Sequence, residues 1–143
     1  MDIDKLLKWF PASFLMKLPK NFVSKIGLED LLQIRVMLYI RETYPNANAF
    51  SIKNESNQRK VTPIALWKFK QMGLKSGVSD VLILEPNSEY HGMVIELKSP
   101  DKFTVSDNQK KFLEQASKSG YYTLLSNDFD TIKTTIDYYL NNN

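Results

Sequence analysis

The stretch GVSDVLILEPNSEYHGMVIELK, residues 77–98, decides the fold of this chain. It contains two short apolar runs with strand character, separated by a turn-rich break over residues 85–92. If the runs form an antiparallel hairpin whose turn is centred on Ser88, counting outward equally in both directions places Asp80 opposite Glu96. Cross-strand neighbours have Cβ atoms about 5 Å apart. The hairpin therefore predicts two carboxylates side by side.

A lysine joins this pair. Side chains alternate along a strand, so Glu96 and Lys98 share one face of the sheet while Leu97 faces the other. Like charges placed opposite each other destabilise a sheet, and ionised groups are costly to bury without a counter-charge. A divalent cation resolves both problems, with Asp80 and Glu96 as ligands and the backbone carbonyl of Leu97 as a third oxygen. Lys98 would then contact a phosphate or position the attacking water.

Each of these residues also has an ordinary structural explanation. Asp80 could be a polar residue entering a strand, and Glu96 with Lys98 could be a solvent-facing row on an edge strand. Taken singly, these explanations are the better ones. The register that aligns Asp80 with Glu96 favours the metal site, where a cation would acidify a bound water and neutralise charge developing on a phosphodiester.

Composition limits the other chemistries. The chain has 143 residues, enough for one domain, with no cysteine and a single histidine, His91. Disulfides, cysteine-ligated zinc, iron-sulfur sites and sites that need several histidines are therefore excluded. An oxygen-ligand site remains, which suits Mg²⁺ or Mn²⁺. No segment is typical of a membrane span, and charges interrupt the N-terminal apolar residues, so we expect a cytoplasmic protein without a signal peptide.

The net charge of +3 is modest, but the positive charges are concentrated just before Asp80. The only acid among them is Glu55. A solvated helix face explains any one lysine, whereas the clustering favours phosphate contacts. The cations of this segment are Lys53, Arg59, Lys60, Lys68, Lys70 and Lys75, and we predict that Lys53, Arg59, Lys60, Lys68 and Lys75 bind DNA.

The rest of the chain is typical of an α/β domain with a central mixed β-sheet flanked by helices. The final strand is expected to run parallel to the strand of Glu96 through a helical crossover. We interpret residues 1–27 as an N-terminal helical extension and 28–143 as a single globular domain. Helices are predicted at about 28–44, 62–72, 106–119 and from 128 onward, and further strands at 49–52 and 121–125.

Three residues have two interpretations each. Gln109 either closes a capping box with Ser106 or points its amide at the sheet beside Glu96. Glu29 is either a first-turn acid of its helix or a third carboxylate of the metal site. His91 is interpreted as a loop residue of the hairpin turn.

Read together, these segments resemble the VRR-NUC (virus-type replication-repair nuclease) family of the PD-(D/E)XK restriction-endonuclease-like superfamily. The resemblance implies a restriction-endonuclease-like core and an Mg²⁺- or Mn²⁺-dependent DNA nuclease. It implies that Asp80 and Glu96 bind metal, that Lys98 is catalytic, and that Glu29 and Gln109 complete the site. The motifs that carry it are residues 29–33, Asn54-Glu55, Arg59, residues 73–80, Tyr90-His91-Gly92, residues 95–98, Ser106, Gln109 and Gly120-Tyr121.

Ser79 departs from the family pattern, which usually has proline before the aspartate. Proline would stiffen the turn without adding chemistry, so we expect little loss. The resemblance also implies a phage or bacterial protein that acts on branched or junction-containing DNA in replication, repair or recombination, with a homodimer as one arrangement. Two alternatives are a catalytically inactive DNA-binding or assembly module with the same fold, and a protein-interaction domain. The N-terminal extension either covers the core or forms a dimer surface.

Overall fold

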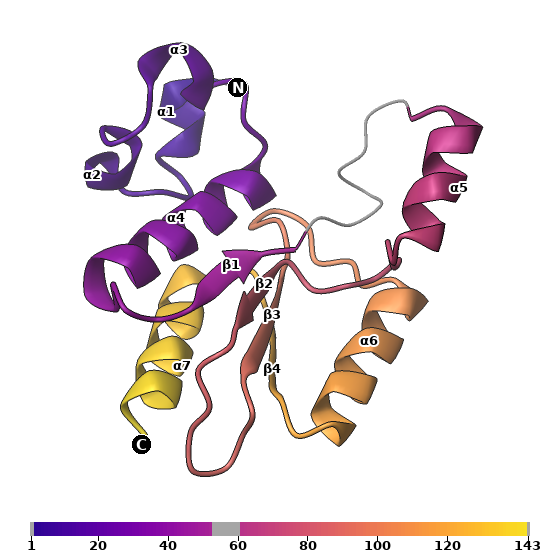
Figure 1. The fold of residues 1–143 in the computed structure, drawn as a ribbon. Coiled ribbons are helices and arrows are strands. Elements are labelled where there is room, and N and C mark those ends of the chain that lie inside the picture. The colour runs from indigo at the N-terminus through magenta and orange to yellow at the C-terminus, as the bar shows by residue number, and fades with distance from the viewer. Residues whose placement is uncertain (1, 53–60, 143) are drawn as a thin grey trace.

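A computed structural model describes residues 2–52 and 61–142 of the chain. The described residues contain a four-stranded mixed sheet in the order β1-β2-β3-β4 (Figure 1). Neighbouring strands are antiparallel except for the pair β3 and β4, which is parallel. The predicted α/β class and the parallel crossover are therefore confirmed. The strands are β1 (Ala49–Ser51), β2 (Val81–Ile83), β3 (Met93–Leu97) and β4 (Tyr122–Ser126).

The hairpin of β2 and β3 has the register predicted from the sequence. Val81 lies opposite Ile95, and Leu82 lies opposite Val94. Extending this pairing by one residue places Asp80, just before β2, opposite Glu96 in β3. Register is strongly specified here because a one-residue slip would turn every buried side chain of the strand to the other face.

Helices α4 (Leu28–Thr43) and α7 (Phe129–Asn141) cover one face of the sheet (Figure 1). Each helix has apolar side chains that are buried against the strands. The Asp128 carboxylate caps α7 by accepting a hydrogen bond from the Thr131 N–H. Among the described residues, no helix has the length and apolar character needed to cross a membrane. The core of this face includes Leu31, Leu32, Val36, Ile40, Val81, Ile83, Met93, Ile95, Leu97, Ile132, Ile136 and Tyr139.

The opposite face of the sheet carries Leu82, Val94 and Glu96 by strand alternation. Helix α6 (Asp107–Lys118) lies against this face, but none of its residues is fully buried. Helix α5 (Pro63–Gln71) stands apart from the sheet beyond α6 (Figure 1). Glu96 therefore lies on the face of the sheet that the helices cover less completely.

The described part of the N-terminal segment forms short helices, α1 (Ile3–Leu6), α2 (Ala12–Leu15) and α3 (Lys20–Val23). Their buried side chains, including Leu6 and Phe10, belong to the same hydrophobic core as α4. This packing agrees with an extension that covers the core. The division of the chain at residues 27 and 28 stays a prediction.

Candidate active site

Asp80 is held at the start of β2 by a backbone contact across the hairpin. It is 8% exposed, and its Oδ2 atom accepts a hydrogen bond from the Leu97 N–H at 2.7 Å. The preceding turn passes close to α6, because a Cβ atom on Gly77 would lie 2.5 Å from the carbonyl carbon of Asn108. Gly77 also has a φ of +79°, which favours glycine. The turn therefore fixes Asp80 beside the N-terminus of α6.

Glu96, Lys98 and Gln109 form a closed triangle of hydrogen bonds. Lys98 Nζ donates to Glu96 Oε1 at 2.9 Å and to Gln109 Oε1 at 3.0 Å. Gln109 Nε2 also donates to Glu96 Oε1. Glu96 is 1% exposed and Lys98 5% exposed, so the ion pair is almost completely removed from water. Breaking such a buried pair by removing one charge is strongly destabilising, which keeps both side chains in place.

Gln109 fulfils both of its predicted interpretations. It closes a capping box, since its Oε1 atom accepts the Ser106 N–H at 3.0 Å and its own N–H donates to Ser106 Oγ at 3.2 Å. The same side chain contacts Glu96 and Lys98. The cap thus orients Gln109 toward the sheet, and the two interpretations are not exclusive.

The carboxylates of the site are electrostatically strained. Burial, followed by repulsion from Asp80, raises the pKa of Glu96 to about 7, although Lys98 acts in the opposite direction. Burial also raises the pKa of Asp80, against the hydrogen bond from Leu97 and the charge of Lys98. The pKa of Glu29 is raised by burial and then by the charge of Asp80. The site lacks enough positive charge for its acids.

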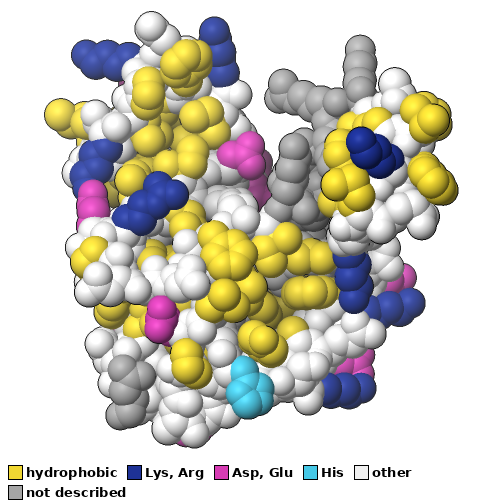
Figure 2. Space-filling model, viewed as in Figure 1, with side chains coloured by type: hydrophobic (Ala, Val, Ile, Leu, Met, Phe, Trp, Pro, Cys, Tyr) yellow, Lys and Arg dark blue, Asp and Glu magenta, His cyan; other side chains and the backbone are white. Residues whose placement is uncertain are grey.

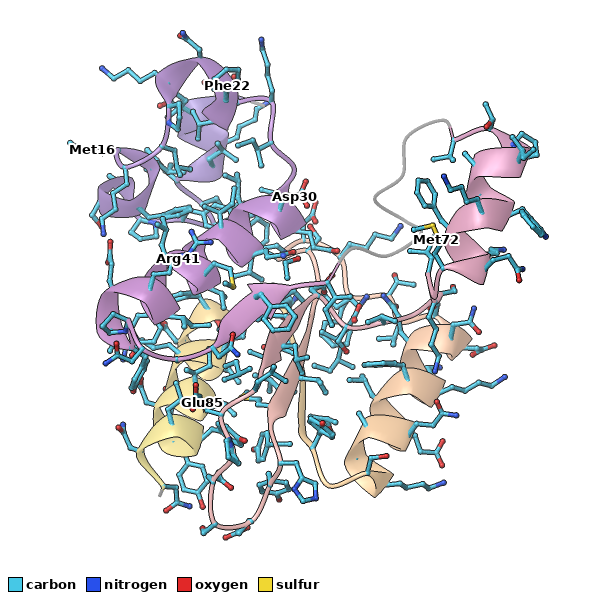
Figure 3. The ribbon with its side chains drawn as sticks, viewed as in Figure 1. Met16, Phe22, Asp30, Arg41, Met72 and Glu85 are labelled. Carbon is cyan, nitrogen blue, oxygen red and sulfur yellow. The ribbon has the colours of Figure 1, made fainter. Side chains whose placement is uncertain are left out.

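Glu29 and Asp30 lie in the first turn of α4, at the edge of the site. Figure 3 shows Asp30 at this end of α4. The negative charge of Asp30 adds to the repulsion that raises the pKa values of Asp80 and Glu29. Asp30 was not among the site residues predicted from the sequence. Its position directly after Glu29 in the same helical turn was the signal that could have indicated it.

The donor set suits a hard cation. Over residues 2–52 and 61–142, no group of three or more His, Cys, Asp or Glu side chains is arranged to hold a metal ion. However, Glu96 Oε2 is a buried carboxylate oxygen without a hydrogen-bond partner among the described residues. Such an oxygen is costly unless a cation or donor reaches it. Mg²⁺ is commonly held by one or two carboxylates together with several waters. Asp80 and Glu96 could supply the carboxylates.

The backbone of Leu97 points toward the same place. Its side chain is fully buried in the core on the other face, as predicted. Its N–H donates to Asp80, and the N–H and C=O of one strand residue point toward the same neighbour. The carbonyl of Leu97 therefore faces the side of the strand on which Asp80 lies.

The predicted DNA-binding residues are only partly placed. Lys53, Arg59 and Lys60 lie outside the described residues, as do Asn54 and Glu55. Lys68 is on α5. Lys75 lies against α6, where its Nζ atom donates to Gln115 Oε1 at 3.4 Å and sits 5.8 Å from the centre of the Phe112 ring. His91 is exposed, and it packs edge-on against Tyr121 with ring centres 6.2 Å apart.

A search among protein families matches the VRR-NUC domain to residues 20–125. This chain belongs to the VRR-NUC domain family. The match covers the catalytic candidates from Glu29 to Gln109, and it implies a nuclease-type fold and a nucleic-acid substrate.

Two solved structures are similar to this chain. A structure titled "VRR_NUC domain protein" is 28% identical to this VRR-NUC chain, with a TM-score of 0.62 over 80% of this chain and 89% of the other. A second, titled "VRR_NUC domain", is 16% identical, with a TM-score of 0.48, 80% of this chain covered and 99% of the other. A search of curated proteins gave no significant match.

Proposed function

We propose that this VRR-NUC protein is a metal-dependent DNA endonuclease that hydrolyses phosphodiester bonds, with a preference for branched, junction or flap DNA in replication, repair or recombination. One observation supports this most strongly. Asp80 and Glu96 lie opposite each other in the register of the hairpin, and a buried oxygen of Glu96 has no hydrogen-bond partner in the described part of the chain. No described residue donates a hydrogen bond to this oxygen, so a bound cation could be its partner.

Asp80, Glu96 and the Leu97 carbonyl are the proposed ligands of Mg²⁺ or Mn²⁺. A bound ion would acidify a water molecule and neutralise the charge that develops on the phosphate. The Leu97 N–H holds the Asp80 carboxylate through one oxygen and leaves its other oxygen for the ion. Glu29 stays a prediction as a further ligand.

Lys98 and Gln109 are proposed to act as one unit. The Lys98 ammonium is fixed by Glu96 and Gln109, so its position does not depend on substrate binding. From that position it would donate a hydrogen bond to the phosphate or to the attacking water. Gln109 holds Lys98 and Glu96 at the correct distance, which makes it a positioning residue.

The function is tested by a cleavage panel. Flap, four-way junction, linear duplex and single-stranded DNAs would be incubated with Mg²⁺, with Mn²⁺ and with a chelator. We expect cleavage only with metal, and only background cleavage for Asp80→Asn and Glu96→Gln. Asp107→Asn is the matched control, because this side chain is 91% exposed and faces solvent in the first turn of α6.

The outcomes separate the alternatives. If Asp80→Asn or Glu96→Gln cuts at the wild-type rate in Mg²⁺, the assignment of the site is wrong. If the wild-type protein binds DNA but cuts none of the substrates with either metal, it is an inactive binding or assembly module. Phosphate contacts release counterions and weaken with salt, so a protein that binds no DNA and whose binding to its partner stays the same between low and high salt would be a protein-interaction domain.

A further inference from the structure

Helix α5 exposes an unusual amount of apolar surface. Ile64 is 77% exposed, Trp67 63% and Met72, at the end of the helix, 71%. None of the residues from Pro63 to Gln71 is buried. Single exposed apolar side chains are normal, but a group of them on one short element marks an interaction surface. Figure 2 shows this apolar surface on the part of the molecule that stands apart from the rest.

The exposed residues form a mixed apolar and positive stripe. Ile64, Trp67 and Lys68 are spaced i, i+3 and i+4, so they lie on one side of α5. Between residues 61 and 79 the sequence contains Lys68, Lys70 and Lys75 and no acidic residue. An exposed aromatic side chain beside a lysine can stack on a base and contact a phosphate of a nucleic acid.

The helix is anchored next to the candidate active site. After α5 the chain turns at Gly73, whose φ is +101°, and Leu74 N–H donates back to the Phe69 carbonyl at 2.8 Å. Ser76 Oγ then accepts a hydrogen bond from Asn108 Nδ2 at 3.2 Å. Asn108 directly precedes Gln109 in α6. The loop that follows α5 is therefore fixed to α6, the helix that carries Gln109 of the site.

The end of α5 and the start of α4 lie on either side of the end of the sheet that carries Asp80. Figure 3 shows the two labelled residues that mark these places, Met72 after the last turn of α5 and Asp30 in the first turn of α4. A strand of DNA whose phosphate reached Lys98 would have α5 on one side.

We infer that α5 binds unpaired bases next to the phosphate that is cut, with Trp67 stacking on a base and Lys68 contacting the backbone. This inference rests on the proposed nuclease function and assigns to α5 the recognition of the single-stranded part of a flap or junction substrate. In an intact duplex the faces of the bases are stacked on each other, so Trp67 would have no base face to contact.

A second copy of the chain is a weaker occupant of this surface. In a symmetric contact through this stripe, Lys68 of one copy would approach Lys68 of the other. Such a contact would bring like charges together without an acid on α5 to balance them. A nucleic acid provides both phosphates for Lys68 and base faces for Trp67.

The test measures binding without cleavage. In an Asp80→Asn background without metal, fluorescence anisotropy would compare a single strand, a blunt duplex and a duplex with a single-stranded flap. Adding Trp67→Ala should weaken binding of the single strand and the flap by about 5- to 100-fold, as expected for one stacked base. Blunt duplex binding should change less than about twofold, and Trp67→Phe should recover most of the loss by stacking.

Tyr138→Ala is the matched control, because this aromatic side chain is 61% exposed on α7. The chain has two tryptophans, so a Trp9→Phe variant isolates the emission of Trp67, which should be quenched by single-stranded DNA. An equal loss for all three DNAs, or no loss, would overturn the inference. So would a concentration-dependent dimer, seen by light scattering, that Trp67→Ala converts to monomer.

The two proposals fail in different ways. If the wild-type protein cuts DNA but Trp67→Ala binds and cuts flap DNA as well as the wild type does, the role of α5 is wrong and the nuclease function stands. If the wild-type protein cuts no DNA while Trp67→Ala still loses single-strand binding selectively, α5 is a base-binding helix on an inactive module.

Discussion

Glu96 makes the stability of the metal-free protein depend on pH. Its pKa is raised from 4.5 to about 7 in the folded protein, chiefly by burial and then by Asp80. Between these two values the folded state holds a proton that the unfolded state has released, so the free energy of unfolding falls as the pH rises. Below the window both states are protonated, and above it both are ionised.

The size of the effect follows from the shift. At 1.36 kcal/mol per pKa unit, the free energy of unfolding should fall by about 3 kcal/mol at most from pH 4.5 to 7. The opposing effect of Lys98 is already contained in this raised pKa, so we expect a fall of about 2–3 kcal/mol. Asp80 and Glu29, whose pKa values are also raised, add smaller contributions of the same sign.

The measurement is urea unfolding followed by tryptophan fluorescence at several pH values with a chelator present. Glu96→Gln cannot ionise at this position, so it should keep only the shallow slope that comes from the other two acids. Millimolar Mg²⁺ should flatten the wild-type slope by stabilising the ionised pair. A wild-type protein whose stability is constant or rises between pH 4.5 and 7 would refute the electrostatic reasoning.

Four further outcomes are expected. Ser79→Ala should raise the free energy of unfolding by about 1–2 kcal/mol, because its buried hydroxyl has no hydrogen-bond partner among the described residues; a lower melting temperature would contradict this. Gln109→Ala should cost about 1 kcal/mol of stability and slow cleavage, whereas Ser106→Ala should cost similar stability and leave cleavage near the wild-type rate. Asp137→Ala should lower the free energy of unfolding by about 2–3 kcal/mol in chemical denaturation, because Asp137 accepts hydrogen bonds from two tyrosine hydroxyls and a lysine. Lys68→Ala should reduce the slope of log affinity against log salt by about 0.9 if it contacts one phosphate, and an unchanged slope would remove it from the interface.

The sequence was sufficient to predict the hairpin and most of the elements. Side chains alternate along a strand with a period of two residues, so a slip of one residue would take Val81, Ile83 and Ile95 out of the core that they share. The observed register also places Asp80 opposite Glu96. The helix that begins at Leu28 follows from its apolar composition and its first-turn acids, and the helix that begins at Asp107 follows from its capping box and apolar stripe. The parallel direction of β4 follows from the helical crossover that precedes it.

Other features depend on contacts that no local pattern encodes. The hydroxyls of Tyr39 and Tyr44 both donate to Asp137, which lies far away in the chain. The composition of α5 predicts a helix, but not that its apolar side chains stay uncovered. Likewise, the raised pKa of Glu96 depends on how completely α6 and the sheet exclude water from it. Tertiary packing decides all three.

The most direct test of the account is manganese binding seen by anomalous diffraction. Crystals soaked in Mn²⁺ should show an anomalous peak between the carboxylates of Asp80 and Glu96, within about 2.3 Å of an oxygen from each. The peak should disappear in Asp80→Asn. Absence of a peak at this position in the wild-type protein, or a peak that persists in the variant, would contradict the central claim that this pair of carboxylates forms the metal site.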